Sequence, residues 1–142
     1  MSKIAVIKCN EKEVELLARL MRAEAEGDGV KGMLLVGNVG VNRVIAKCLD
    51  FKNISTITDM VYQSPGGFES TTKSYFYQAA RSQDIKLARR AINGEKIPPA
   101  SYSLWFYNPF GGVCQETWFG QYNVGYYKSH CFYAPDRNEN CR

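Results

Sequence analysis

Histidine is almost absent from this sequence, and long apolar runs and dense clusters of basic residues are missing. Of the 142 residues only His130 is a histidine, and the five cysteines do not follow the spacing of a zinc site. The sequence therefore predicts no metal centre and no other cofactor, since it also has no glycine-rich phosphate-binding motif. No segment is long enough to span a membrane, and the net charge of +4 arises without the basic runs typical of nucleic-acid binding. We expect neither a membrane nor a nucleic acid as a partner.

The N-terminus lacks the features of a secretory signal, because the apolar stretch after Met1 is too short. We therefore expect synthesis in the cytosol without export by the usual route. Cysteine pairing stays open, because the five residues permit two disulfides and one free thiol, or no disulfide at all. Cys114, Cys131 and Cys141 are close enough in sequence for a crosslink near the C-terminus.

The sequence pattern predicts that the first part of the chain is helical. Asn10 followed three residues later by Glu13 predicts a capping box at the start of a first helix, which ends at the glycines at 27 and 29. A second helix is predicted from about Val30 to Cys48. It is apolar on most sides, which is typical of a buried helix.

Two kinds of residue interrupt the apolar second helix. Gly37 and Gly40 cost helix stability, which predicts that they allow a neighbouring element to approach closely. Asn38 and Asn42 lie four residues apart on one face, and on a buried helix they need hydrogen-bond partners.

The rest of the chain is predicted to hold shorter elements, which change from helices to strands after Pro99. In chain order they are a helix at 56–62, a loop at 63–68, one or two helices between 71 and about 92, and strands at 103–107, 124–127 and around 131–133. No internal repeat or low-complexity linker divides the sequence. We therefore predict one domain over residues 1–142, of the α+β class, with a helical N-terminal part and a small β-rich C-terminal part.

Glu24 falls on the apolar face of the first predicted helix. At about 100° per residue it lies within roughly 20° of Leu17 and roughly 40° of Leu20, whereas Glu26 points to the opposite side. Burial raises the pKa of a carboxyl group and keeps its proton near neutral pH, which a proton donor to a glycosidic oxygen requires. The alternative is a helix-end glutamate that has already turned toward water, because Gly27 follows so soon.

A second catalytic carboxylate is not evident from spacing. Glu69 and Asp59 are the nearest candidates, and each fits a surface or capping role better. A hydrolase with two carboxylates needs both of them across the bond, so a lone acid favours a route in which the substrate supplies the nucleophile. A Cys-His dyad of His130 and Cys131 is disfavoured, because adjacent residues of a strand face opposite sides.

Aromatic residues gather between Ser101 and Tyr133, in the predicted β-rich part. Such rings line a sugar-binding groove or fill the core of a sheet, and composition alone does not separate the two.

Five blocks, in order, resemble a known family. They are Ala23–Gly27, Val36–Arg43, Tyr62–Phe68, Leu104–Pro109 and Lys128–Tyr133. Together they resemble the SleB/CwlJ family of spore cortex-lytic cell wall hydrolases, most closely its short CwlJ branch, over nearly the whole chain. The resemblance implies a lysozyme-like fold and a catalytic role for Glu24, since the family's catalytic glutamate lies in the Ala-Glu-Ala block. It also implies the substrate, the peptidoglycan of the spore cortex, cut during germination between N-acetylmuramic acid and N-acetylglucosamine in the manner of a lytic transglycosylase.

The resemblance implies roles for eight further residues. Substrate contacts are expected from Gln63, Phe68, Trp105, Tyr107, Asn108 and His130, and support from behind the site is expected from Asn42 and Arg43. For His130 a structural hydrogen bond is the alternative. Synthesis in the mother cell and deposition in the spore coat or outer cortex are also implied, with a coat protein as a further partner.

Two other functions stay open at this point. One is an amidase that cuts the stem peptide from muramic acid, although such enzymes usually use zinc and one histidine makes that site hard to build. The other is a non-catalytic protein that binds cortex or belongs to the coat structure.

Overall fold

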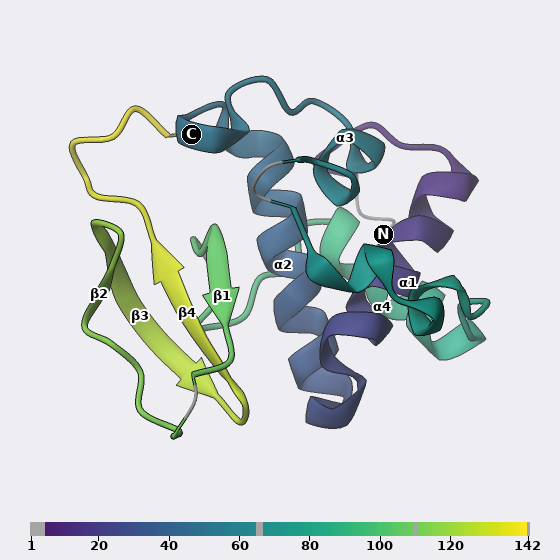
Figure 1. The fold of residues 1–142 in the computed structure, drawn as a ribbon. Coiled ribbons are helices and arrows are strands. Elements are labelled where there is room, and N and C mark those ends of the chain that lie inside the picture. The colour runs from purple at the N-terminus through teal and green to yellow at the C-terminus, as the bar shows by residue number, and fades with distance from the viewer. Residues whose placement is uncertain (1–4, 65–66, 110, 142) are drawn as a thin grey trace.

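The computed structural model describes residues 5–64, 67–109 and 111–141. Its helices are α1 (Glu11–Ala25), α2 (Gly29–Ala46), α3 (Ile57–Val61) and α4 (Ser82–Ile92), and its strands are β1 (Trp105–Tyr107), β2 (Thr117–Trp118), β3 (Gln121–Tyr127) and β4 (His130–Ala134). The strands form one antiparallel sheet in the order β1-β4-β3-β2. The sheet lies on one side of α2, and α1, α3 and α4 lie on the other (Figure 1). The predicted α+β class, with helices first and a small sheet after them, is confirmed.

The start of α1 has the predicted capping box. The Asn10 side chain accepts a hydrogen bond from the Glu13 backbone N–H at 2.9 Å, and the Glu13 carboxylate accepts one from the Asn10 N–H at 3.4 Å. The apolar face of the helix, including Leu17, Leu20 and Met21, is fully buried. Burial of this face fixes the rotation of α1 and therefore the direction in which its last turn points.

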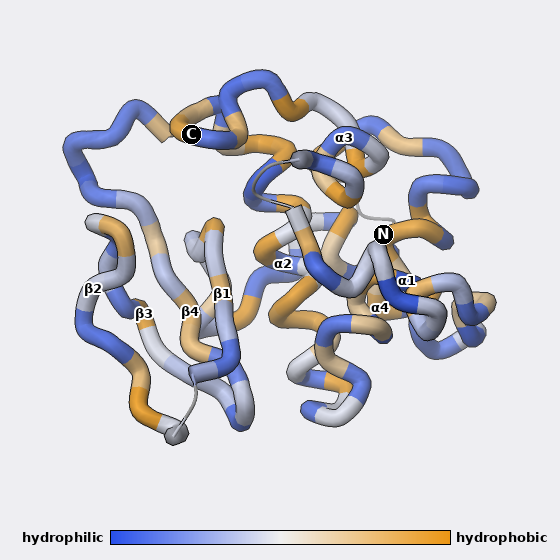
Figure 2. The backbone as a smooth tube through the Cα atoms, in the orientation of Figure 1, coloured by the Kyte–Doolittle hydropathy of each residue, from blue (hydrophilic) through white to orange (hydrophobic). Residues whose placement is uncertain are grey.

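Helix α2 is the central element, as its apolar composition predicted. Leu35 and Val39 pack against Phe132 of β4 on the sheet side. The hydropathy colouring shows α2 largely apolar along its length (Figure 2). Among the described residues no helix combines the length and apolarity that crossing a bilayer would need.

Both asparagines of α2 have the partners that burial demands. Asn38 donates to the Glu95 carbonyl at 2.7 Å and accepts from the Ile97 N–H at 2.9 Å. Asn42 donates to the carbonyls of Ala100 and Ser103, each at 3.0 Å. These hydrogen bonds hold the segment that connects α4 with the sheet against the central helix α2.

Gly37 allows the close approach that its position predicted, and it supplies a stability test. A Cβ atom there would lie 2.8 Å from Met21 Cε and 3.2 Å from Ala91 Cβ. The methionine end can move, but Ala91 Cβ is fixed to the backbone of α4, so Gly37→Ala must push α2 and α4 apart. We expect a loss of about 1–2 kcal/mol in the free energy of unfolding, measured by urea denaturation.

Gly27→Ala is the matched control for that experiment, because nothing lies within 4 Å of a Cβ atom at this position. An equal loss in both variants would show that the α2–α4 contact is not the cause.

Several details differ from the sequence-based expectations. Residues 69–77 form two 3-10 turns, Glu69–Thr72 and Ser74–Tyr77, and only the part from Ser82 onward is α-helical. Strand β2 was not predicted, because two residues are too few to show alternation. Of the predicted loop at 63–68, residues 65 and 66 lie outside the described residues.

Two disulfides connect the chain. Cys114–Cys131 joins two of the three late cysteines, whereas Cys48–Cys141 ties the C-terminal segment to the loop that follows α2. Cys9 has a free thiol. Two disulfides and one free thiol were one of the outcomes left open, but the pairing of Cys48 with Cys141 was not anticipated, because a separation of 93 residues leaves no local signal in the sequence.

Candidate active site

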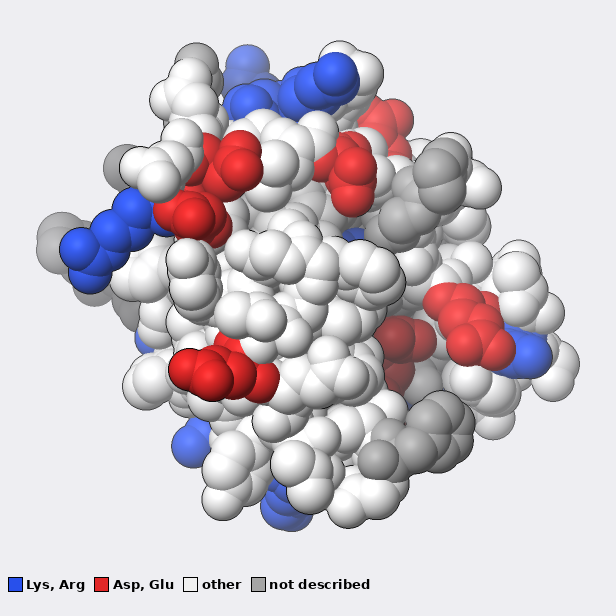
Figure 3. Space-filling view, turned by 60° about the vertical axis from the view of Figure 1, so that its left-hand side comes forward, with Lys and Arg blue, Asp and Glu red and all other residues white. Residues whose placement is uncertain are grey.

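A cleft of about 620 Å³ opens where the end of α1, the last turn of α2 and the sheet meet. Its walls carry one guanidinium group, carboxyl groups and several aromatic rings, with contributions from Glu24, Arg43, Phe68, Trp105, Trp118 and Phe119. The space-filling view in Figure 3 shows one face of the molecule with a hollow that has acidic side chains inside and beside it. The cleft combines polar groups with aromatic walls, which suits a carbohydrate chain.

Glu24 lies in the last turn of α1 and is half-buried, as its helical phase predicted, whereas Glu26 is exposed. Burial raises the pKa of the Glu24 carboxyl group above its ordinary value of 4.5, and the charge of Glu69 adds to the rise. Three neighbours act in the opposite direction and keep the pKa from rising further: Ser70, His130 and Arg43. The site therefore holds a carboxyl group that keeps its proton to higher pH than an exposed glutamate.

The buried hydroxyl of Ser70 faces this carboxyl group. It makes no regular hydrogen bond among the described residues, yet it lies close enough to Glu24 to lower its pKa. Sequence reasoning missed Ser70, because only the 3-10 turn after Phe68 returns it to the end of α1.

Arg43 reaches the cleft itself, although support from behind was expected. Its guanidinium group lies 4.7 Å from the ring centre of Phe51 and 4.5 Å from that of Phe68, and its Nε donates to the Leu104 carbonyl at 2.8 Å. Burial lowers the pKa of Arg43 to about 10, while Glu24 and Asp50 act to raise it. Arg43 still carries its charge at neutral pH, so a fixed cation lies beside Glu24.

Two further carboxylates border the cleft, although sequence spacing pointed to no second catalytic carboxylate. Glu69 is exposed and lies 3.7 Å from Lys73 Nζ, and Asp50 follows the end of α2. Asp59, the other candidate from the sequence, lies on α3, where it accepts a hydrogen bond from the Ser55 backbone, and is not part of the cleft. The turns that carry Glu69 and Asp50 are irregular, so helical phase gave no sign of either.

Of the expected aromatic contacts, Phe68 and Trp105 line the cleft and Tyr107 does not. The Tyr107 ring stacks on Trp118, with 5.0 Å between ring centres, and on Tyr133, with 5.6 Å, so it supports the Trp118 side of the cleft wall. Trp118 and Phe119 were not singled out from the sequence, and Phe119 is 83% exposed at the rim.

The expected amide contacts also lie outside the cleft lining. Gln63 donates to the Asp50 carbonyl at 2.7 Å, which steadies the turn at Leu49–Phe51 beside the cleft. Asn108 is exposed after β1, and its amide, in the orientation that gives it partners, donates to the Ser129 carbonyl at 3.2 Å.

His130 makes the structural hydrogen bond that was its alternative role. Its Nδ1 lies 2.8 Å from Oδ2 of Asp28, which also accepts a hydrogen bond from the Ser129 hydroxyl at 2.7 Å. The imidazole and the Phe106 ring, which lines the cleft, meet edge to face with 5.0 Å between ring centres. Asp28 was not singled out from the sequence, yet it is buried and joins two parts of the fold.

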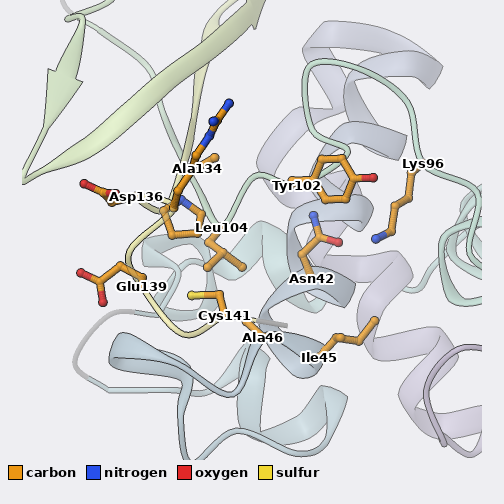
Figure 4. Close-up of a pocket in the computed structure, with 12 residues that line it drawn as sticks. Asn42, Ile45, Ala46, Lys96, Tyr102, Leu104, Ala134, Asp136, Glu139 and Cys141 are labelled. Atoms are coloured by element: carbon orange, nitrogen blue, oxygen red, sulfur yellow. The ribbon is translucent and has the colours of Figure 1, made fainter.

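A second cavity, of about 280 Å³, lies on another side of α2. Its walls come from α2, from the chain before β1 and from the C-terminal segment, including Asn42, Lys96, Tyr102, Asp136, Glu139 and Cys141 (Figure 4). Asn42 therefore faces this cavity while its neighbour Arg43 faces the cleft. The described part of the chain holds no cluster of three or more His, Cys, Asp or Glu side chains suited to a metal ion.

The fold matches two solved structures. The catalytic domain of Bacillus cereus SleB superposes with a TM-score of 0.68 at 22% identity, covering 89% of this chain and 92% of that one. The catalytic domain of SleB from Bacillus anthracis, described as a germination-specific lytic transglycosylase, gives a TM-score of 0.65 at 21% identity, covering 88% of this chain and 96% of that one. These likenesses confirm the predicted lysozyme-like fold.

Sequence comparisons identify the family. The family described as Cell Wall Hydrolase matches residues 27–133, a stretch that begins just after Glu24. The chain is 71% identical to the cell wall hydrolase CwlJ of Oceanobacillus iheyensis over 132 residues, which are 93% of each chain. It is 54% identical to CwlJ of Bacillus subtilis over 93% of this chain and 92% of that one. The chain therefore belongs to the SleB/CwlJ family of cell wall hydrolases, and within it to the CwlJ branch.

Proposed function

We propose that this cell wall hydrolase cleaves the glycan strand of spore-cortex peptidoglycan during germination, between N-acetylmuramic acid and N-acetylglucosamine, with Glu24 as acid and then base. The observation that carries the proposal is a half-buried carboxyl group of raised pKa in a cleft walled by aromatic rings. A protonated acid near neutral pH is what glycosidic cleavage needs, and aromatic faces pack on the apolar faces of sugar rings.

Under this proposal Glu24 acts twice. Its carboxyl proton passes to the glycosidic oxygen as the bond to the anomeric carbon breaks, which leaves a carboxylate and an oxocarbenium-like sugar. The carboxylate then takes the proton of the muramic 6-hydroxyl while that oxygen attacks the anomeric carbon, and a 1,6-anhydro end forms without water. The charge of Arg43 favours the carboxylate that exists between the two steps.

A second candidate chemistry is hydrolysis by a muramidase with two carboxylates. The specific observation in its favour is that Glu69 and Asp50 border the same cleft as Glu24. In that case one of them would activate a water molecule or attack the anomeric carbon, and the product would carry an ordinary reducing muramic acid. An amidase would instead release stem peptides and leave the glycan strand intact.

The products of cortex digestion test these chemistries directly. Purified cortex peptidoglycan is incubated with the wild type, Glu24→Gln, Glu69→Gln and Asp50→Asn, and the soluble fragments are identified by mass spectrometry. We expect 1,6-anhydro-muramic ends that disappear only in Glu24→Gln.

Three other sets of products would contradict this expectation, and each would point to a different function. Reducing muramic ends that disappear in Glu69→Gln or Asp50→Asn would establish the two-carboxylate hydrolase. Free stem peptides would establish an amidase, and the absence of soluble fragments would leave a cortex-binding or coat protein. Deposition in the spore coat or outer cortex, beside a coat protein, remains a prediction from the family resemblance.

A further inference from the structure

Asp28 joins the α1–α2 junction to the turn between β3 and β4. It lies four positions after Glu24, immediately before α2, and is only 8% exposed. Its Oδ2 atom accepts hydrogen bonds from two consecutive residues, Ser129 of that turn and His130, the first residue of β4. A buried carboxylate at the start of a helix is favoured by the helix dipole, so Asp28 is a rigid acceptor for the His130 ring.

The His130 ring lies between Asp28 and the cleft. A carboxylate on Nδ1 places the proton on that nitrogen and fixes the ring plane, and Nε2 has no hydrogen bond to any described residue. The ring supports Phe106, which forms part of the cleft wall. Its charge, when the ring is protonated, acts on the Glu24 carboxyl group.

We propose that Asp28 is a positioning residue of the reaction: it holds the His130 imidazole by Nδ1 behind Phe106, in the wall of the cleft that also holds Glu24. The ring then favours the Glu24 carboxylate that forms after the first proton transfer. No proton leaves the Asp28–His130 pair in this role, since the proton of Glu24 goes to the leaving oxygen and returns from the 6-hydroxyl. This inference rests on the proposed function, because it needs Glu24 as the acid and base.

The other groups that face Glu24 come from different elements and stay in place when His130 is changed. Arg43 approaches from α2, and Glu69 and Ser70 approach from the 3-10 turn after Phe68. Removing the imidazole therefore leaves one cation, one anion and one hydroxyl around the carboxyl group. The contribution of His130 is separable from theirs.

The test uses His130→Asn and Asp28→Asn, with rates measured on soluble cortex glycan strands from pH 4 to pH 9. In His130→Asn the introduced amide can still donate to Asp28 as Nδ1 did, so the link between sheet and helix is kept while the ring is lost. We expect kcat to fall roughly ten- to a hundred-fold with KM nearly unchanged. The protonated ring lowers the pKa of Glu24, so its loss raises that pKa and moves the high-pH limb of the rate profile to higher pH. For Asp28→Asn we expect a fall in kcat in the same direction.

Asp84→Asn is the matched control. Asp84 is also a buried carboxylate in the first turn of a helix, α4, where it accepts hydrogen bonds from Arg81, and it is not part of the cleft. Its loss should lower the melting temperature and leave kcat and the pH profile unchanged at temperatures where the variant is folded. If His130→Asn keeps the kcat and pH profile of the wild type, the positioning role is overturned. Glu24→Gln in the same series separates the two proposals, because an active Glu24→Gln would overturn the proposed function itself.

Discussion

Glu24→Gln is expected to lower the rate of glycan cleavage roughly 10²–10⁴-fold, the range that a general acid and base contributes. The amide keeps the size and hydrogen-bonding capacity of the side chain but has no acidic proton to give to the glycosidic oxygen. The cleft and its aromatic walls are untouched, so binding of glycan strands should persist. The measurement is the initial rate of fragment release from purified cortex, together with a binding assay on the same material.

The same variant should change stability in a pH-dependent way. Burial raises the pKa of Glu24 in the folded protein above its ordinary value of 4.5, so the folded state holds the proton more tightly than the unfolded chain. Stability is therefore lost as pH rises from the unfolded pKa through the folded one. Glutamine has no such penalty. Glu24→Gln should be more stable than the wild type at pH 8, and the difference should vanish at low pH, where Glu24 is protonated in both states.

Glu26→Gln is the control for both effects. Glu26 lies two residues away and is exposed, and it pairs with Arg22 at 3.1 Å and Arg81 at 3.2 Å. We expect nearly full activity and at most a small, salt-sensitive loss of stability. Equal activity losses in the two variants would show that Glu24 has no special part in the chemistry.

Helical periodicity was enough to find Glu24 because it is a local property. The capping box at Asn10 and the apolar stripe through Leu17 and Leu20 fix the phase of α1, and the phase persists as far as Ala25. The same reasoning placed α2 and predicted that its asparagines need hydrogen-bond partners. Backbone hydrogen bonds within an α-helix fix a period of about 3.6 residues per turn. The direction in which each side chain points can therefore be read from its position in the sequence.

The neighbours of Glu24 depend on contacts between distant parts of the chain, which no local pattern encodes. Ser70 and Glu69 reach the carboxyl group through a 3-10 turn, and Asp28 meets His130 across a separation of 102 residues. The family resemblance supplied candidate site residues, but it did not show which of their side chains point into the cleft. It named Tyr107, whereas Trp118, on a two-residue strand, covers that ring and faces the cleft.

Arg43→Met is expected to damage both stability and activity, because one buried cation serves both. Arg43 is 5% exposed, stacks on the rings of Phe51 and Phe68, and binds the Leu104 carbonyl. Methionine fills similar volume but leaves that carbonyl without its donor and removes the cation from the two rings. These losses amount to about 2–4 kcal/mol in the free energy of unfolding, measured by urea denaturation.

The pH dependence of Arg43→Met distinguishes its electrostatic part from its packing part. Arg43 lowers the pKa of Glu24, so its removal raises that pKa further and moves the high-pH limb of the activity profile upward. The destabilisation should grow from pH 4 to pH 8, because only the ionised form of Glu24 is stabilised by the cation at position 43. Arg43→Lys, which keeps the charge, should show the packing loss without this growth.

A double-mutant cycle with Glu24→Gln isolates the coupling. In the Glu24→Gln background no carboxylate forms, so Arg43→Met should cost the same free energy at pH 4 and pH 8. If the growth with pH persists in that background, the cation acts on another group, and Asp50 is the first candidate because it also raises the pKa of Arg43. If it disappears, the buried Arg43 is the group that allows Glu24 to ionise repeatedly inside the cleft, which is the condition for one carboxyl group to act as both acid and base.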